Sequence, residues 1–298
     1  MDKIRMWFIA ILFLSGLGIT LYPFVSNLIA QSNASRAIDS YNEIVAQMDE
    51  EEIDAAKAAI QKYNEQLNNA FVSGQEMEEG ISYVDMMDIG ESIGFITIPK
   101  IDVDLPIYNG TGEDVLQKGV GHLENSSYPV GGMGTHSVLT GHRGLPNAVL
   151  FTDLNKLEEG DYFYLHVLDE VLAYRVDQIK VVLPEETGDL KIEKDKDYCT
   201  LVTCTPYAVN THRLLVRGSR TEYIPEEESR QELEYVDVSS GTLVKRLVDA
   251  RAWLAVALLG MVIVESMFFV LIVSTRAKIR RRKRAGLRRQ KESQKGWE

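Results

Sequence analysis

The chain of 298 residues is poor in cysteine, with only Cys199 and Cys204. The two lie five positions apart in a run that reads as one strand. Their side chains therefore point to opposite faces, and we do not expect a disulfide between them. The apolar runs described below place this region outside a membrane, where a free thiol invites a chemical explanation because no structural bridge uses it.

Motifs that bind metal ions or nucleotides are also absent. There is no C-x-x-C, H-E-x-x-H or EF-hand pattern, and no phosphate-binding or dinucleotide-binding glycine loop follows a predicted strand. The acidic loop at 185–189 has enough charge to attract calcium, but such a cluster on an acidic surface is more often only solvated. We expect a protein that works without a cofactor and without a metal ion.

Positive charge is scarce in most of the chain. Residues 31–240 carry about 16 basic and 39 acidic residues, whereas the tail after residue 275 carries eleven Lys and Arg against two acids. The tail directly follows an apolar run, so we interpret it as a stop-transfer and lipid-facing cluster rather than a nucleic-acid patch. We expect no nucleic-acid partner.

Two apolar runs, Met6–Phe24 and Ala252–Ser274, are long enough to cross a bilayer. Glu265 interrupts the second run at a cost of roughly 2.5–3.5 kcal/mol, which about thirteen Leu, Ile, Val and Phe offset at roughly 0.3–0.6 kcal/mol each. Basic residues flank both runs on their outer ends, which places both termini in the cytoplasm and residues 30–250 outside. The alternative for the first run is a signal peptide cleaved near Ala30.

Hydrophobic periodicity predicts an N-terminal helical region and then a mainly β domain. Apolar residues recur at helical spacing over 33–70, residues 68–80 resemble an exposed loop, and a short helix is expected at 77–87. From Ile93 onward, about eight short strands and one short helix near 151–157 indicate a closed or nearly closed β-barrel. The expected strands are 94–99, 103–108, 137–140, 161–167, 172–176, 178–183, 198–203 and 213–218.

Cys204 stands at the end of a β-branched strand and is followed by Pro206, so its side chain is held firmly yet can meet a substrate. A thiol needs a base to become a nucleophile, and a guanidinium can stabilise the oxyanion that forms when a carbonyl is attacked. Arg213 opens the next strand, which brings it to the same end of a hairpin. Cys199, earlier in the strand, is expected to be buried and inert.

Five histidines compete for the role of the base. His166 lies within an apolar strand and is expected to be structural, and His212 is expected to be a surface residue. His122, His136 and His142 all lie in loop-like contexts, and the residues alone barely separate them. His142 has a glycine on either side, which suits a ring presented at a cleft.

Three separated motifs resemble those of sortases, the membrane-bound transpeptidases of Gram-positive bacteria. Residues 200–204 read Thr-Leu-Val-Thr-Cys, residues 140–144 read Thr-Gly-His-Arg-Gly, and Arg213 opens the strand after the cysteine. The resemblance covers about residues 90–220. It implies an eight-stranded sortase-type β-barrel with N-terminal helices and two flanking transmembrane helices, with Cys204, His142 and Arg213 as the catalytic residues.

The two apolar runs and the long helical region resemble the class C sortases, which assemble pili. That resemblance implies an LPxTG-like sorting signal as the acyl donor, a thioacyl enzyme on Cys204, and the lysine amine of another pilin as the acceptor. In this scheme His142 moves the proton and Arg213 holds the substrate. A sortase that anchors surface proteins to a cell-wall amine of peptidoglycan is the alternative, and a non-catalytic pilus-assembly scaffold is a further one.

The chain departs from the class C pattern at the lid. Class C sortases usually carry Asp-Pro-aromatic before the first barrel strand, whereas the corresponding loop here reads Asn69-Ala70-Phe71. Phe71 is expected to fill the cleft, but the acid that would pair with the arginine is missing. Phe71 and Thr203 are the two further residues expected at the lid or the substrate.

Together these features predict a two-pass protein of the cell membrane, with the catalytic domain on the extracellular face. The expected division is an anchor or signal at 1–30, a helical region with the lid loop at 31–90, the barrel at 91–222, a tether at 223–250, a second transmembrane helix at 251–275 and a basic cytoplasmic tail at 276–298.

Overall fold

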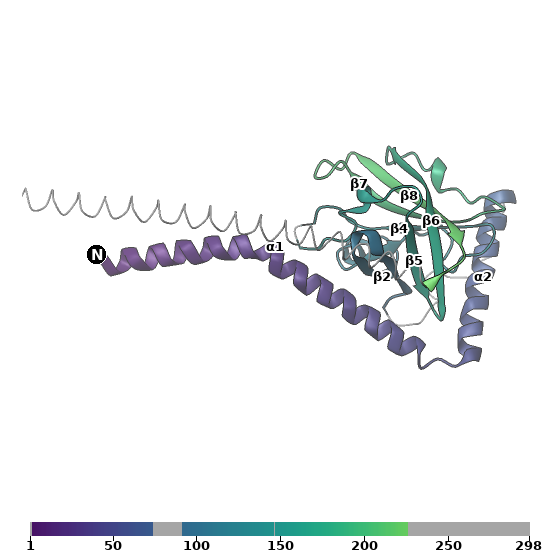
Figure 1. Cartoon of the computed structure of the whole chain (residues 1–298), viewed down its shortest axis with the longest axis horizontal. Helices are drawn as coiled ribbons and strands as arrows, with labels where there is room; N and C mark the ends of the chain where they lie inside the picture. Colours follow the sequence, from purple (N-terminus) through teal and green to yellow (C-terminus); the bar gives the residue numbers. More distant parts are fainter. Residues whose placement is uncertain (1, 74–90, 146, 226–298) are drawn as a thin grey trace, which may run out of the picture. The chain divides into compact units, whose positions relative to one another are not determined.

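A computed structural model describes residues 2–73, 91–145 and 147–225 (Figure 1). The short helix predicted at 77–87, most of the tether, the second apolar run and the basic tail lie outside the described residues.

Two helices precede the barrel, α1 (Asp2–Val45) and α2 (Glu50–Ser73). A turn at 46–49 separates them, so the helical pattern predicted over 33–70 belongs to two helices. Asp49 starts α2 as its N-cap: its carboxylate accepts from the Glu52 amide (2.8 Å), and the Glu52 carboxylate accepts from the Asp49 amide (3.0 Å). This reciprocal capping box satisfies two amides that a helix start leaves unpaired.

One prediction in this region is wrong. Residues 68–73 continue α2 and are not a loop, so Asn69-Ala70-Phe71 lies on a helix. Within the described residues, one helical stretch, Ile11–Val45, is long and apolar enough to cross a membrane. This stretch belongs to α1 and contains most of the first apolar run.

The described residues form a closed barrel of eight strands in the order β1-β2-β3-β4-β7-β8-β6-β5. The pairs β2–β3 and β4–β7 are parallel, and the other neighbours are antiparallel. The predicted eight-stranded barrel is confirmed. Its strands are β1 (Gly94–Ile98), β2 (Val103–Asn109), β3 (Val120–His122), β4 (Thr135–Thr140), β5 (Tyr162–Val167), β6 (Glu170–Val182), β7 (Asp197–Thr205) and β8 (His212–Thr221).

Two strands differ from the expectation. β3 was not predicted, and β6 is one long strand where two were expected, with a register shift between Val176 and Gln178. A β-bulge of this kind bends a strand while its pairing continues. Four short helices complete the description: η2 (Pro99–Ile101), α3 (Glu113–Leu116), η3 (Leu154–Lys156) and η4 (Gly188–Leu190). Of these, η3 lies within the short helix predicted at 151–157.

The N-terminal helices share the hydrophobic core of the barrel. Tyr41 of α1 and Ile60, Tyr63 and Leu67 of α2 are buried in one cluster with the inward side chains of the strands. Two polar contacts hold the helices in place against the barrel. The Leu168 amide donates to the Tyr41 hydroxyl (2.6 Å), and Asn64 pairs through both side-chain atoms with the Tyr128 backbone (2.8 and 3.2 Å).

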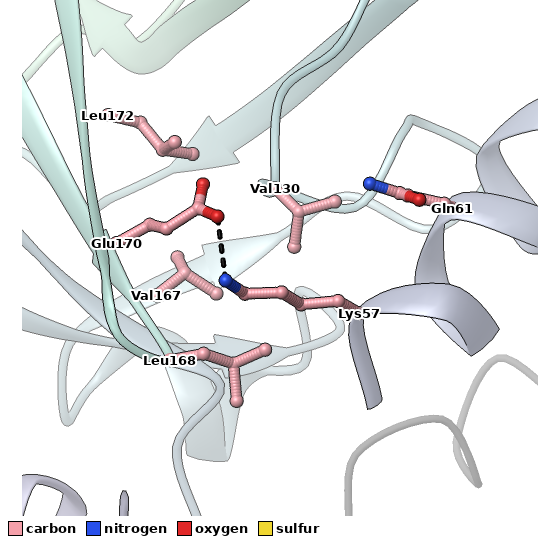
Figure 2. A pocket seen from close by; sticks show the side chains of 7 residues that line it. All are labelled: Lys57, Gln61, Val130, Val167, Leu168, Glu170 and Leu172. Atoms are coloured by element: carbon pink, nitrogen blue, oxygen red, sulfur yellow. Dashed lines mark hydrogen bonds and ion pairs between the residues drawn. The ribbon is translucent and has the colours of Figure 1, made fainter. Parts of the chain in front are cut away.

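An ion pair holds α2 beside the β5–β6 hairpin. Lys57 reaches into a small crevice lined by Val167 and Leu172, where its ammonium lies 2.7 Å from Glu170 (Figure 2). The same ammonium lies 2.6 Å from Asp169. The lysine stem packs on apolar side chains while the charged end stays at the rim, a common compromise for long basic residues.

Candidate active site

Cys204 lies at the end of β7, between β4 on one side and β8 on the other. The register pairs it directly with Arg213, the second residue of β8. Both cysteines are free. Cys199 is completely buried, and burial raises the pKa of its thiol well above the usual value, with a smaller contribution from the Asp197 charge. Cys204 is partly exposed, so of the two thiols it is the one that a substrate can reach.

The parallel pairing of β4 with β7 brings His142 to the same end of the barrel. The ladder runs to Thr140 opposite Val202 and is extended by two more bonds. The Gly141 amide donates to the Val202 carbonyl (3.1 Å), and the Thr203 hydroxyl donates to the Gly141 carbonyl (2.7 Å). The residue after Gly141 and the residue after Thr203 are therefore neighbours at the ends of two paired strands.

Arg213 is held beside the turn that joins β7 to β8. Its Nη1 donates to the carbonyls of His212 (3.1 Å) and Asn210 (3.3 Å). The turn begins at the cis peptide bond between Thr205 and Pro206. The three residues predicted from the motifs, Cys204, His142 and Arg213, thus come from three adjacent strands that end at one site.

A carboxylate faces the imidazole of His142. Glu113 of α3 places its Oε2 3.4 Å from the His142 Nε2, which is ion-pair range, although the pair does not meet hydrogen-bond geometry and the Nε2 has no hydrogen-bond partner in the described structure. The Gln117 amide holds the other carboxylate oxygen of Glu113 (2.9 Å). The pKa of Glu113 is lowered mainly by the hydrogen bond from Gln117, and to a smaller extent by the charge of His142. Sequence reasoning missed Glu113, and no motif marks it.

The rings of His122 and His136 are buried and make hydrogen bonds to other parts of the fold. The His122 Nε2 donates to the Ser127 carbonyl (2.8 Å), and burial lowers its pKa to about 4. The His136 Nδ1 donates to the Lys191 carbonyl (2.8 Å), its Nε2 accepts from Thr200 (2.7 Å), and burial lowers its pKa.

The remaining two histidines lie where the sequence placed them. His166 stacks on Phe95, and burial lowers its pKa to about 4. His212 is partly exposed and contacts the Thr211 hydroxyl (2.9 Å).

Arg143, next to His142, ties three segments of the site together, and sequence reasoning did not single it out. Its guanidinium donates to the Thr205 hydroxyl at the end of β7 (3.0 Å), to the Thr152 carbonyl (3.2 Å) and to the Asn155 side chain (2.7 Å).

The Tyr207 ring covers Gly144, where φ is +81° and a Cβ would come within 2.9 Å of the ring. Glycine is required there for both reasons.

The two residues expected at the lid or the substrate have other surroundings. Thr203 is buried, and its hydroxyl is used by the Gly141 carbonyl, so it links the cysteine strand to the histidine loop instead of facing a substrate. Phe71 lies on α2 with 52% of its surface exposed. Within the described ranges, no group of three or more His, Cys, Asp or Glu is arranged to hold a metal ion.

The structure contains a closed eight-stranded barrel. A cysteine, a histidine and an arginine lie at the ends of three adjacent strands, and this combination of fold and residues is the basis for comparison with known proteins. The sortase-domain family model matches residues 96–221. Two curated relatives are sortase D of Bacillus subtilis (34% identical over 121 residues, 41% of this chain) and sortase A of Bacillus anthracis (30% over 132 residues, 44% of this chain). The chain spans 58% and 61% of the lengths of these two relatives.

Solved structures extend the likeness beyond the barrel. Sortase C1 of the GBS pilus island 1 matches with a TM-score of 0.61 and 43% identity over 64% of this chain and all of that one. A Clostridium perfringens sortase C, solved with its C-terminal cell wall sorting motif, matches with a TM-score of 0.58 and 50% identity over the same shares. A Streptococcus pneumoniae sortase C, described in terms of pilin substrate specificity, matches with a TM-score of 0.57 and 47% identity over 63% and 97%.

The chain belongs to the sortase family, whose members are cysteine transpeptidases. The resemblance inferred from its three motifs is confirmed, including the likeness to class C sortases.

Proposed function

We propose that the chain is a membrane-anchored transpeptidase that joins an LPxTG-like sorting signal to an amine, with Cys204 as nucleophile, His142 as proton carrier and Arg213 as oxyanion and substrate ligand. The observation that carries the proposal is the strand register: Cys204 pairs with Arg213, and the Thr203–Gly141 bond joins the cysteine strand to the histidine loop. These groups match the requirements of acyl transfer through a thiol.

The reaction has two balanced steps. In the first, the Cys204 sulfur, as thiolate, attacks the threonine carbonyl of the signal, the Thr–Gly bond breaks, and His142 gives a proton to the departing glycine amine. In the second, an acceptor amine attacks the thioester carbon, loses a proton to the imidazole and displaces the Cys204 thiolate. Arg213 donates to the oxyanion in both steps, where charge develops in the transition state.

For the acceptor we propose a lysine amine of another pilin, which makes the reaction pilus polymerisation. Support comes from the solved relatives, which include a sortase of a pilus island and one described by its pilin specificity, both more than 40% identical to this chain. The alternative acceptor is a cell-wall amine of peptidoglycan, which requires the same three residues and differs only in the second step.

For the location we propose a two-pass protein of the cell membrane, with the barrel on the extracellular face and both termini in the cytoplasm. The helical stretch Ile11–Val45 and the apolar run Ala252–Ser274 support the two spans. We keep the domain boundaries expected from the sequence as part of this proposal, without the lid loop, and α1 continues from the membrane into the extracellular domain without interruption.

The test uses the full chain in detergent micelles with a peptide that carries an LPxTG-like signal. Cys204→Ala abolishes peptide cleavage and the thioacyl adduct seen by mass spectrometry, whereas Cys199→Ala, its matched control, retains both. Equal loss in the two variants would contradict the assignment. A lysine peptide and a peptidoglycan amine are then offered together, and the product that forms identifies the acceptor.

A further inference from the structure

An apolar groove lies between the anchor helix and the wall of the active site. Pro23 and Leu28 of α1 form one side, and Leu145, Val149 and Tyr207 form the other. Val149 belongs to the loop that follows His142, and Tyr207 belongs to the turn that follows Cys204. One hydrogen bond crosses the groove, from the Val149 amide to the Asn27 side chain (3.2 Å).

The position of Asn27 along α1 sets the height of this groove above the membrane. The apolar run ends at Phe24, three residues before Asn27, and α1 is helical across both positions. At 1.5 Å per residue, Asn27 stands about 4.5 Å beyond the end of the run. The headgroup layer on each side of the hydrocarbon core is about 5–7 Å thick. The contact between Asn27 and Val149 therefore falls within the headgroup layer of a bilayer that α1 crosses.

Exposed apolar side chains line this groove at Val149 and Tyr207 and continue to Val209, two residues further along the same turn. Val149, Tyr207 and Val209 are 41%, 56% and 64% exposed, and they lie on two different loops. Tyr22 of α1 is also exposed, near the outer end of the apolar run. Tyrosine is favoured at the membrane–water interface, where its apolar ring meets lipid and its hydroxyl meets water.

We propose that Leu145, Val149, Tyr207 and Val209, called here the lipid rim, contact the phospholipid headgroup layer of the membrane that α1 crosses. The proposal rests on the proposed membrane anchoring. Its partner is a phospholipid surface, because the same helix that forms one side of the groove also passes into the bilayer three residues away.

The lipid rim is continuous with the catalytic residues. The Phe151 amide donates to the His142 carbonyl (3.1 Å), and the Gly144 amide donates to the Thr152 hydroxyl (3.2 Å). Tyr207 covers Gly144 from the other loop. Under this proposal the loops that carry His142 and Tyr207 lie near the bilayer surface, so Cys204 acts close to the membrane and not in bulk water.

The test places a fluorophore at single cysteines in the full chain. The background is Cys204→Ala, in which the remaining Cys199 is completely buried. Val149→Cys and Val209→Cys report on the lipid rim. Met133→Cys is the control: it is 71% exposed and lies before the first residue of β4, at the opposite end of a strand about 20 Å long. Leu17→Cys, within the apolar run, reports on anchoring.

Each variant is reconstituted into phosphatidylcholine vesicles with a nitroxide on the headgroup or on the acyl chain. We expect headgroup nitroxide to quench the labels at 149 and 209 at least about twofold more than the label at 133, and acyl-chain nitroxide to quench the label at 17. Quenching at 17 with equal quenching at 133, 149 and 209 overturns the lipid rim and leaves the anchoring intact. No quenching at 17 overturns the anchoring, and the lipid rim with it.

Iodide in the bulk solution gives the second measurement. If iodide fails to reach the labels at 149 and 209 while headgroup nitroxide also leaves them unquenched, a protein surface covers them, and the lipid proposal is wrong. The proposed function is tested separately, by peptide cleavage with unlabelled Val149→Cys and Val209→Cys chains that keep Cys204. The quenching measurements use the Cys204→Ala background, so their outcome does not depend on catalysis.

Discussion

At the scale of single residues, the imidazole of His142, the proton carrier in the proposed function, has a charged neighbour. Gln117 holds one carboxylate oxygen of Glu113 and leaves the other 3.4 Å from the His142 ring. A carboxylate at this distance stabilises the positive charge that the ring carries while it holds a proton during acyl transfer. Glu113 is 68% exposed, however, so solvent and salt screen the pair.

We expect Glu113→Gln to lower kcat/KM by only about two- to fivefold at low ionic strength, because solvent screens an exposed ion pair and leaves it weak. The difference should shrink in high salt, where the pair is already screened. Asp114→Asn, which removes an adjacent acid on the same helix, is the control. Rates of peptide cleavage across a salt series provide the measurement. A loss that is equal in both variants, or that does not depend on salt, contradicts the role of Glu113.

His122 predicts how stability depends on pH. Burial lowers its pKa from 6.5 to about 4, so the unfolded chain binds a proton more readily than the folded one. The stability that the neutral, buried His122 contributes to the folded state is fully present above pH 6.5 and is lost as the pH falls from 6.5 towards 4. Between pH 6.5 and 5 we expect a loss of about 1.5 kcal/mol.

Thermal unfolding of the full chain in detergent across this range measures the loss. His122→Gln should be less stable at pH 7 but should lose less on acidification, and His212→Gln, at a partly exposed site, should follow the parent. The same pH dependence in His122→Gln and the parent would show that His122 is not the group responsible.

The pairing of Cys204 with Arg213 could be predicted from the sequence, because the two residues flank one short turn between strands, which places them opposite each other. The histidine was harder. What separates His142 from His122 and His136 is the use of the other two rings by the Ser127 and Lys191 carbonyls, contacts that cross the fold. Glu113 was out of reach for the same reason, since only the folded barrel brings α3 to the imidazole.

At the scale of elements, the strands that the sequence misread are those whose length is set by their neighbours. β3 has only three residues and owes its existence to parallel pairing with β2 and antiparallel pairing with β4. β6 reads as two strands because Asp177 interrupts its apolar pattern, but the bulge at that point lets the pairing with β8 continue. The extent of α2 was underestimated because residues 68–73 lack an apolar stripe.

The bond from Thr203 to Gly141 predicts a positioning role at this scale. Thr203→Val leaves a carbonyl at the histidine loop without its donor, and we expect kcat to fall about tenfold with little change in KM, because a small displacement of reacting groups costs that much or more. Thr203→Ser restores the hydroxyl and should recover most of kcat.

The matched control is Thr200→Val, which removes another buried hydroxyl bond on the same strand, the one to His136 (2.7 Å). Both valine variants should lose stability by about 1–3 kcal/mol, since each leaves a buried polar group unpaired. Only Thr203→Val should lose kcat. Peptide turnover and thermal unfolding, measured on the same preparations, show whether Thr203 positions the histidine loop. Similar losses of kcat in the two variants would show that Thr203 only stabilises the fold.

At the scale of the whole molecule, the N-terminal helices are part of the barrel's core, and under the proposed function α1 is also the link to the membrane. Tyr41, Ile60, Tyr63 and Leu67 are at least 94% buried among barrel side chains, and Tyr41 also receives the Leu168 amide. We propose a different role for the N-terminal part of α1, because its described apolar side chains, among them Ile11, Leu12 and Leu14, are exposed and suit lipid. The division between anchor and folded domain therefore falls inside α1.

Truncation tests where that division lies. A chain that begins at residue 31 keeps Tyr41 and α2, and we expect its barrel to unfold within a few degrees of the full chain in detergent. A chain that begins at residue 50 loses Tyr41, which exposes apolar core and leaves the Leu168 amide unpaired, at a cost of several kcal/mol. For a domain of this size that loss lowers Tm by roughly 10 °C or more.

Tyr41→Phe in the full chain separates the hydrogen bond from the packing. It should lower Tm by a few degrees through the unpaired amide alone, whereas Tyr22→Phe, at an exposed position on the same helix, should leave Tm unchanged. Equal Tm values for the chains that begin at residues 31 and 50 would show that α1 contributes nothing to the folded domain. In that case α1 would serve only as the membrane anchor, and the barrel's core would close without Tyr41.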